Sequence, residues 1–217
     1  MEEGHVCLRP EPRLISVNVG TVQEVEWCGR TVQTAIWKHS IHGPLTLRGV
    51  NLVGDEQADR SVHGGADKAV YAYAMEDYEF WGGTEKFEVR PGLFGENLTL
   101  RNLDLGGAVI GERWHVGSAL LEVAQPRLPC FKLGIRVGDA EFPKRFQLAL
   151  RPGAYLRIIE EGALQAGDIV VVTYRPAHGV TVRLVAESVR DPVKARGLAA
   201  VPELPASWRA RALNRSH

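Results

Sequence analysis

A series of short β-rich runs at the start of the chain limits what it can fold into. They occupy residues 14–20 (LISVNVG), 22–27 (VQEVEW), 30–37 (RTVQTAIW) and 45–53 (LTLRGVNLV). Some of these runs alternate apolar and polar residues, and Gly, Pro, Asn or charged residues separate them. Such spacing is typical of strands joined by tight turns, so we expect a mainly antiparallel β structure.

The middle of the chain continues this pattern and contains few helices. Further strands are expected at residues 69–75, 114–125, 155–162 and 168–174, with Gly117-Ser118 as a tight turn inside the second of them. Apolar residues at helical spacing predict short helices at residues 75–82 and 141–150.

The sequence changes in character after Tyr174. Prolines recur at Pro176, Pro192, Pro202 and Pro205, and the segments between them read as three short helices. We therefore expect three parts, which are a loose N-terminal arm at residues 1–12, a β domain at 13–174 and a helical C-terminal appendage at 175–217.

Charge and hydropathy exclude two classes of partner. The net charge is zero, from 26 basic and 26 acidic residues, although the part from Arg175 onward carries eight basic and three acidic residues. No dense basic cluster with interleaved aromatic residues occurs, so binding of a nucleic acid polymer is not expected. No run of about 18 apolar residues and no apolar signal core occur, so we expect no membrane association and a cytoplasmic location.

The cysteines and histidines exclude several metal and catalytic classes. The three cysteines are Cys7, Cys28 and Cys130, and none forms a CxxC pair, which disfavours a disulfide scaffold and a multi-cysteine zinc site. Three cysteines cannot supply the four ligands of an iron–sulfur cluster. The seven histidines form no HExxH motif, and no GxSxG motif occurs, so a histidine-rich zinc hydrolase is disfavoured.

The first segment that could carry chemistry is residues 54–73 (GDEQADRSVHGGADKAVYAY). Gly64 and Gly65 permit a positive φ and close approach of the backbone to a ligand. His63 and Lys68 could then bind an anion beside exposed N–H groups. A polar loop whose glycines make a turn is the alternative, and the residues by themselves leave both open.

The second segment is residues 92–100 (GLFGENLTL), in which Glu96 and Asn97 precede a β run. They could cap a turn, or Asn97 could offer its amide to a ligand. On spacing alone the turn is favoured.

The third segment is residues 125–136 (QPRLPCFKLGIR). Cys130 follows an extended stretch, because residues before proline disfavour helix. Arg127 and Lys132 flank it, and positive neighbours favour the thiolate that attacks electrophiles and binds metals. A buried, inert cysteine is the alternative, and without further information it is slightly favoured. Cys28 precedes Gly29 at a predicted hairpin turn and lacks such surroundings.

Taken together, these segments resemble the MOSC domain family, in its stand-alone bacterial YiiM-type branch. The resemblance is carried by HGGADKA at residues 63–69, FGENL at 94–98 and QPRLPCFKL at 125–133, in that order. It covers roughly residues 13–174, and the tail at 198–213 also matches. The ordered combination is specific, whereas any one motif alone is not.

The resemblance implies a β-barrel-like core with few helices. It also implies that Cys130 is the catalytic cysteine and ligates the molybdenum of a pterin-bound molybdenum cofactor. The residues implied to bind this cofactor are Arg60, His63, Gly64, Gly65, Lys68, Asn97, Arg127 and Lys132. Pyridoxal phosphate is not expected, because the chain is too short to include the desulfurase to which some family members are fused.

The function implied by the resemblance is reduction of N-hydroxylated bases or related small molecules. The chain has no flavin fingerprint and too few cysteines for its own cluster, so a separate electron-donating reductase is expected as a partner. Two alternatives remain. One is a sulfur carrier that holds a persulfide on Cys130 and receives sulfur from a cysteine desulfurase. The other is a cofactor-binding module without catalysis.

Overall fold

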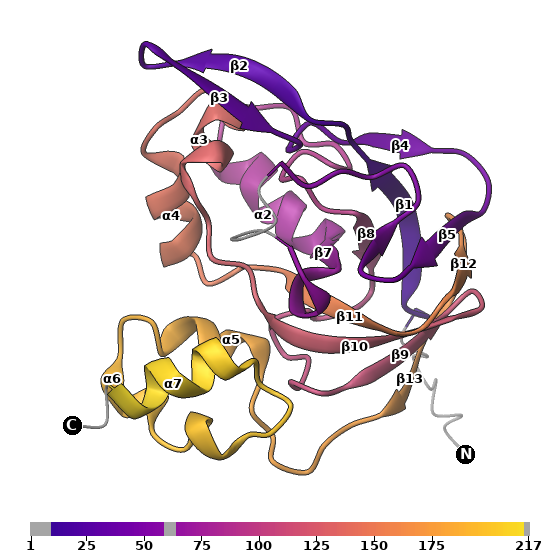
Figure 1. Ribbon diagram of the computed structural model, residues 1–217, viewed down its shortest axis with the longest axis vertical. Helices are drawn as coiled ribbons and strands as arrows, with labels where there is room; N and C mark the ends of the chain where they lie inside the picture. The colour runs from indigo at the N-terminus through magenta and orange to yellow at the C-terminus, as the bar shows by residue number, and fades with distance from the viewer. Residues whose placement is uncertain (1–9, 59–63, 215–217) are drawn as a thin grey trace, which may run out of the picture.

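A large sheet dominates the computed structural model, which describes residues 10–58 and 64–214 (Figure 1). The strands of this sheet are β1 (Arg13–Val19), β4 (His39–Ile41), β7 (Val70–Ala74), β8 (Leu98–Arg101), β9 (Arg113–Val116), β10 (Ala119–Pro126), β11 (Ala154–Glu160) and β13 (Val170–Tyr174). Their order is β13-β9-β10-β11-β7-β8-β1-β4. Only β7 and β8 pair in parallel, so the prediction of a mainly antiparallel β structure is confirmed.

The two ends of this sheet approach each other at the start of β1. The Leu14 N–H donates to the Asp168 carbonyl at 2.9 Å, and the Gly167 N–H donates to the Leu14 carbonyl at 2.7 Å. An isolated bridge joins Arg13 to Ile169 just before β13. The sheet therefore curls into a barrel-like form, although no continuous ladder of the described residues closes it.

Two smaller sheets complete the β structure. One contains β12 (Gly162–Leu164), β5 (Leu45–Arg48) and β6 (Asn51–Leu52), and the other is a hairpin of β2 (Gln23–Trp27) and β3 (Arg30–Thr34). Cys28 and Gly29 connect β2 to β3 with φ values of 50° and 73°. Positive φ at both positions is what a tight two-residue hairpin requires, so the turn predicted there is confirmed.

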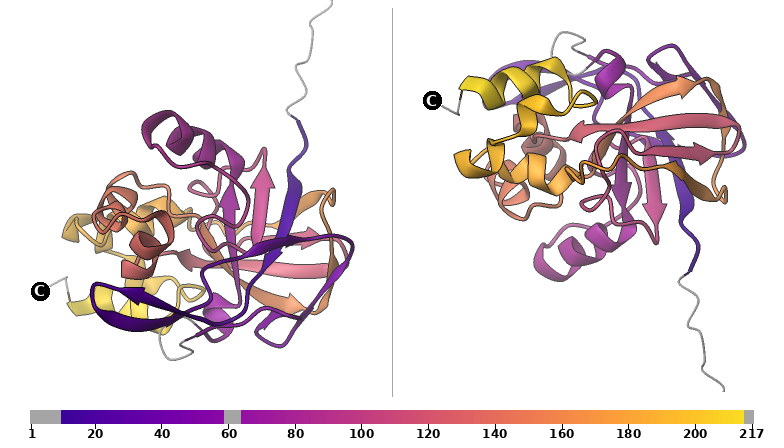
Figure 2. Two further views of the ribbon diagram at one scale, coloured as in Figure 1. Left: turned by 90° about the horizontal axis from the view of Figure 1, so that it is seen from above. Right: turned by 90° about the horizontal axis from the view of Figure 1, so that it is seen from below.

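Helices cover one end of the molecule. They are α2 (Met75–Thr84), α3 (Phe131–Val137), α4 (Phe142–Leu148), α5 (Val182–Glu187), α6 (Pro192–Ala195) and α7 (Ala206–Asn214), with 3₁₀ turns η1 (Ala66–Lys68) and η2 (Leu198–Ala200). In both views of Figure 2, α5, α6 and α7 gather beside the barrel-like part. The helices expected after Tyr174 are present, whereas the division into separate domains stays a prediction. Of the described helices, none has the length and apolar character needed to cross a membrane.

The sequence did not predict α3, which begins directly after Cys130. The two prolines before Cys130 argued for extended backbone there, and no helix was expected after it. The helix forms because Leu133 and Ile135 pack into the protein interior, and tertiary burial outweighs weak local propensity. Gly138 ends the helix in the left-handed conformation, with φ 77°.

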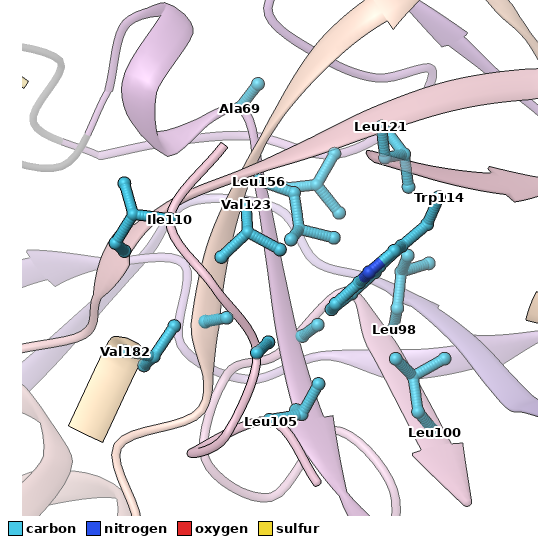
Figure 3. Close-up of a cluster of buried hydrophobic side chains, with 14 of the residues drawn as sticks. Ala69, Leu98, Leu100, Leu105, Ile110, Trp114, Leu121, Val123, Leu156 and Val182 are labelled. Carbon is cyan, nitrogen blue, oxygen red and sulfur yellow. The ribbon is translucent and has the colours of Figure 1, made fainter. Parts of the chain in front are cut away.

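Two apolar clusters lie on either side of β7. Val70, Ala72 and Ala74 face the larger cluster, which includes Trp114 and Leu121 (Figure 3). Tyr71 and Tyr73 face the smaller cluster, whose other buried members are mostly aromatic: Ile36, Tyr78, Trp81, Leu93, Phe94, Leu133, Phe142 and Phe146. Successive side chains of a strand point to opposite faces, so this alternation directs Tyr71 away from the main core.

Candidate functional site

Cys130 lies at the point where strand β10 gives way to helix α3. The strand ends at Pro126, and residues 127–130 form no regular secondary structure. Cys130 itself is extended, with φ and ψ of −119° and 173°. The Leu133 N–H donates to the Cys130 carbonyl at 3.0 Å, which starts the helix. The cysteine side chain is half-buried and lines a pocket of about 100 Å³.

This pocket, which we call the inner pocket, brings together five of the residues predicted from the sequence. They are Lys68, Asn97, Arg127, Cys130 and Lys132. Lys68 ends η1, Asn97 directly precedes β8 and Arg127 directly follows β10. Cys130 directly precedes α3, and Lys132 lies in its first turn. Segments far apart in the sequence therefore meet in one pocket with the cysteine.

The remaining predicted residues either do not line the inner pocket or lie outside the described residues. Gly65 adopts a φ of 89° just before η1, as a glycine turn allows, and the Lys68 N–H donates to its carbonyl at 3.0 Å. Gly64 and Gly65 are not among the residues that line the inner pocket. Arg60 and His63 lie outside the described residues, so their contacts with a cofactor stay predictions.

Arg127 is a buried cation in the wall of the inner pocket. Its side chain packs against aromatic rings, with the guanidinium carbon 4.9 Å from the Tyr71 ring centroid and 5.7 Å from that of Phe146. Within the described part of the chain, its Nη1 atom is buried and has no hydrogen-bond partner. Burial acts to lower the pKa of Arg127. The nearby Tyr71, Tyr155 and Cys130 raise this pKa by a larger amount, so it lies above its ordinary value and the guanidinium stays charged.

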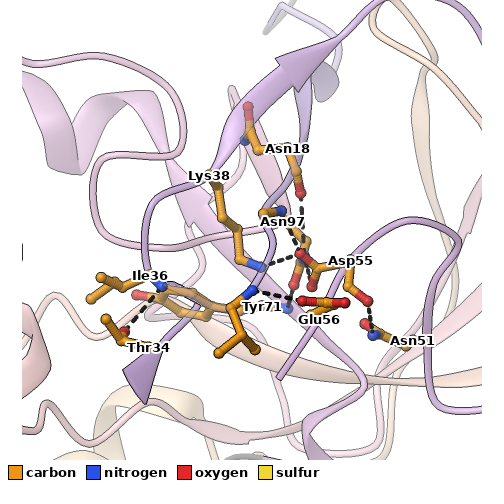
Figure 4. A network of polar contacts seen from close by, with 11 residues as sticks. Asn18, Thr34, Ile36, Lys38, Asn51, Asp55, Glu56, Tyr71 and Asn97 are labelled. Carbon is orange, nitrogen blue, oxygen red and sulfur yellow. Dashed lines mark hydrogen bonds and ion pairs between the residues drawn. The ribbon is translucent and has the colours of Figure 1, made fainter. Parts of the chain in front are cut away.

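A buried ion pair forms another wall of the inner pocket (Figure 4). Lys38 Nζ contacts Asp55 Oδ1, and the two side chains are only 7% and 1% exposed. Asp55 also accepts from the Gly20 N–H at 2.8 Å and from Asn97 Nδ2 at 2.9 Å. Burial lowers the pKa of Lys38, and the charge of Asp55 opposes this shift.

Asn97 uses its side-chain amide to join strand β1, strand β7 and the loop that contains Asp55. Its Nδ2 donates to Asp55 and, at 3.3 Å, to the Asn18 carbonyl. Its Oδ1 accepts from the Tyr71 N–H at 3.1 Å. These bonds give Asn97 a positioning role in the pocket wall, and a contact with a ligand stays a prediction.

Glu96, the neighbour of Asn97, holds the turn before β8. Its buried carboxylate accepts from the Gly92 N–H at 2.6 Å, from the Tyr78 hydroxyl at 2.8 Å and from the Thr99 hydroxyl at 2.8 Å. The turn that spacing favoured for this segment is therefore present. Burial raises the pKa of Glu96, and these hydrogen bonds act against the rise.

Sequence reasoning missed several residues that line the inner pocket. Tyr71 was seen only as part of a buried strand, although its alternation with small residues was a usable signal. Asp55 lay in a segment that we singled out, but nothing marked it among the other acidic residues there. Lys38 and Tyr155 carried no signal, because only tertiary folding brings them to Cys130.

Comparison with known proteins identifies the family of this chain. The profile of the MOSC domain matches residues 59–171, which is more than half of the 217 residues. The chain belongs to the MOSC domain family. Within this MOSC match lie Lys68, Asn97, Arg127, Cys130 and Lys132, whereas Lys38 and helix α7 lie outside it.

Relatives and solved structures agree with this membership. The chain is 36% identical over 173 residues to the uncharacterised protein YflK of Bacillus subtilis, covering 78% of this chain and 77% of YflK. It is 30% identical over 210 residues to a protein of Gibberella moniliformis named "Reductase", covering 87% of this chain but only 37% of that relative. The crystal structure of YiiM from Geobacillus stearothermophilus superposes with a TM-score of 0.78 at 26% identity, covering 95% of this chain and all of YiiM.

Proposed function

We propose that this MOSC protein binds a molybdenum cofactor through Cys130 and reduces N-hydroxylated bases or related small molecules in the cytoplasm. A separate reductase would supply the electrons. The observation that carries the proposal is that Cys130 shares one pocket with the buried cation Arg127. The relative named "Reductase", which is much longer than this chain, supports the reaction class.

The residues present fit such a cofactor. A cysteine thiolate is a soft ligand that suits molybdenum. Lys68, Arg127 and Lys132 would hold an anionic group such as the phosphate of the pterin. Arg127 is the best placed of them for a buried anion, because its buried Nη1 donor is unused within the described residues. In that part of the chain, no group of three or more His, Cys, Asp or Glu residues could hold a metal ion.

The overall reaction sets what the protein must provide. An N-hydroxylated amine, two electrons and two protons give the amine and water, so the N–O bond breaks and nitrogen is reduced. When bound, the molybdenum cofactor supplies the two-electron oxygen-transfer chemistry. The chain itself would hold the metal at Cys130 Sγ, hold the anionic end with Arg127 and its neighbours, and position the substrate near the cysteine.

The experiment is a turnover assay on protein produced in a host that makes the cofactor. An N-hydroxylated purine is offered with a chemical reductant, and the amine product is measured for the wild type and Cys130→Ser. We expect product only from the wild type. No product from fully loaded wild type, together with a stable persulfide on Cys130 after treatment with a cysteine desulfurase, would favour the sulfur carrier instead.

A further inference from the structure

The basic charge of this chain is concentrated in its C-terminal helices, and the proposed function does not use it. From Arg175 onward there are eight basic and three acidic residues, so this part carries a net charge of plus five. The whole chain has a net charge of zero, so the rest of it carries minus five. Helices α5, α6 and α7 gather beside the barrel-like part (Figure 2), which gives the molecule one basic side.

Two arginines on this side have no carboxylate to neutralise them. The three acidic side chains after Tyr174 all make local contacts, which are Glu187 with Lys194 Nζ at 2.6 Å, Glu203 with His178 Nε2 at 3.6 Å, and Asp191 with the Val193 N–H at 2.9 Å. Arg190 and Arg196 flank the single-turn helix α6, and both are exposed. Among the described residues, neither guanidinium forms an ion pair. Both charges therefore face solvent and are available to an acidic partner.

Large apolar side chains are exposed just before and just after Cys130. Leu128 is 38% exposed, and Phe131, the first residue of α3, is 54% exposed. Phe131 is not among the described residues that line the inner pocket, so its ring is not explained by that site. An apolar centre surrounded by polar or charged residues is the usual arrangement of a protein–protein interface.

Helix α7 holds the basic helices next to the loop that contains Cys130. Leu128 and Cys130 line a second cavity together with Trp208 and Arg211 of α7. Trp208 Nε1 donates to Gln125 Oε1 at 2.6 Å, which fixes α7 against strand β10. The exposed apolar residues beside Cys130 and the basic helices are therefore neighbours, and one partner can contact both.

From this arrangement we infer that Leu128, Phe131, Arg190 and Arg196 belong to one docking surface, and that the electron-donating reductase binds there through an acidic surface of its own. The inference rests on the proposed function, and it adds the place where the partner docks and the charge that the partner carries. The basic side attracts an acidic protein, whereas the net negative charge of the rest of the chain repels it. Attraction of this kind would bring the donor to the side of the molecule on which Cys130 lies.

The electrons balance as follows when the donor is flavodoxin, a small acidic protein that carries electrons on FMN. Each fully reduced flavodoxin gives up one electron and becomes the semiquinone. Two such molecules are oxidised for each N-hydroxylated amine that is reduced. Two protons are taken up, the N–O bond breaks, and the products are the amine and water.

The test changes the docking surface and compares flavodoxin with a chemical reductant. Arg190→Glu/Arg196→Glu reverses two exposed charges, and its matched control Arg30→Glu/Arg48→Glu reverses two exposed charges on β3 and β5. Phe131→Ala is matched by Val171→Ala, at a 50% exposed position of β13.

Two measurements are made on each variant. Binding of oxidised flavodoxin is measured by calorimetry at low salt, which requires no turnover. Turnover of an N-hydroxylated purine by the cofactor-loaded protein is then measured with reduced flavodoxin and, separately, with dithionite.

We expect Arg190→Glu/Arg196→Glu to weaken flavodoxin binding at least about tenfold and to raise the KM for reduced flavodoxin by a similar factor. Phe131→Ala should weaken binding at least about threefold, and both controls should change it less than about twofold. Turnover with dithionite stays at the wild-type level in all variants. High salt should weaken binding to the wild type and reduce its difference from Arg190→Glu/Arg196→Glu.

Several results would overturn the inference. One is flavodoxin binding at the wild-type level in Arg190→Glu/Arg196→Glu or in Phe131→Ala. Another is an equal loss in Arg30→Glu/Arg48→Glu, which would mean that net charge acts rather than this surface. A third is a short single-stranded DNA that binds more tightly than flavodoxin and is lost in Arg190→Glu/Arg196→Glu, because the basic side would then be a nucleic-acid site.

Two outcomes separate this inference from the proposed function. Loaded wild type that forms the amine with dithionite but does not bind flavodoxin would overturn the inference and leave the proposed function standing. Wild type that binds flavodoxin through Phe131, Arg190 and Arg196, but forms no amine with dithionite, would support the docking surface and contradict the proposed function.

Discussion

Lys38 and Asp55 form an ion pair that is almost completely buried beside the pocket containing Cys130. In a buried ion pair each charge compensates the other. Removal of one partner leaves an uncompensated charge in the protein interior, which strongly destabilises the fold. The Gly20 N–H and Asn97 Nδ2 would remain as donors to Asp55. Because both residues line the pocket, a change to either one alters the pocket wall and also the stability of the whole protein.

We predict that Lys38→Met lowers the free energy of unfolding by about 3–5 kcal/mol, because it leaves the Asp55 charge buried and unbalanced. The double variant Lys38→Met/Asp55→Asn should recover most of this loss. Urea unfolding at neutral pH measures both. Lys194→Met removes the more exposed pair with Glu187 and should cost less than about 1 kcal/mol. Equal, small losses in Lys38→Met and Lys194→Met would contradict the account.

Glu96 gives a prediction about pH. Because burial raises its pKa in the folded protein above the ordinary value of 4.5, the folded chain binds more protons than the unfolded chain between these two pKa values. The contribution of Glu96 to stability is then complete below pH 4.5 and is lost as pH rises through the folded pKa. The free energy of unfolding of the wild type and of Glu96→Gln should be measured between pH 4 and 8. Relative to Glu96→Gln, the wild type should become less stable as the pH rises. A difference that moves in its favour would mean that hydrogen bonding lowers this pKa.

Arg127→Met separates binding of the cofactor from stability. The substitution removes ring contacts worth about 2 kcal/mol or less, but it also removes a buried donor without a partner among the described residues, whose burial costs about 1–3 kcal/mol. These effects oppose each other, so we expect a change in unfolding free energy below about 2 kcal/mol. Molybdenum content should fall severalfold.

The matched control for Arg127→Met is Arg136→Met. Arg136 also lies over an aromatic ring, 5.6 Å from the Trp37 centroid, and has a buried Nε without a partner in the described part of the chain. It does not line the inner pocket. Its replacement should leave molybdenum content unchanged. Equal loss of molybdenum in both variants would remove the special role of Arg127.

Trp208→Phe tests how α7 is held. The ring stays but the Nε1 donor is lost, which leaves the buried Gln125 oxygen without the 2.6 Å bond. We expect a loss of about 1–3 kcal/mol in unfolding free energy. Trp27→Phe, on the β2–β3 hairpin, should change it by less than about 0.5 kcal/mol. A similar small effect of both substitutions would show that packing alone holds α7.

Most strands could be predicted from the sequence because their signals are local. The turn at Cys28-Gly29 and the buried run that became β7 carried their own signatures in residue type and alternation. Helix α3 could not be predicted, since its stability comes from burying Leu133 and Ile135 rather than from its own propensity. The strand β13 was expected, but the hydrogen bonds between Leu14 and the residues just before β13 were not, because they join distant parts of the chain.

The site was predictable only where motifs marked it. Lys68, Arg127, Cys130 and Lys132 stood in recognisable segments, and the fold brings them to one pocket. Lys38 reaches that pocket through an ion pair with a residue 17 positions away. Ser207 and Arg211 line a second cavity together with Cys130, and Trp208 holds their helix α7 against β10. Such placements follow from tertiary packing, which no local pattern records.

The central claim is that Cys130 holds molybdenum, and the most direct measurement is the metal content of purified protein from a host that makes the cofactor. Elemental analysis compares the wild type, Cys130→Ser and Cys28→Ser, which changes an exposed cysteine at the hairpin turn. Because Cys130→Ser replaces a soft thiolate ligand with a hydroxyl, this variant should lose the metal. We predict about one molybdenum per chain in the wild type and Cys28→Ser, and less than about a tenth of that in Cys130→Ser. Molybdenum in Cys130→Ser at the wild-type level would contradict the account.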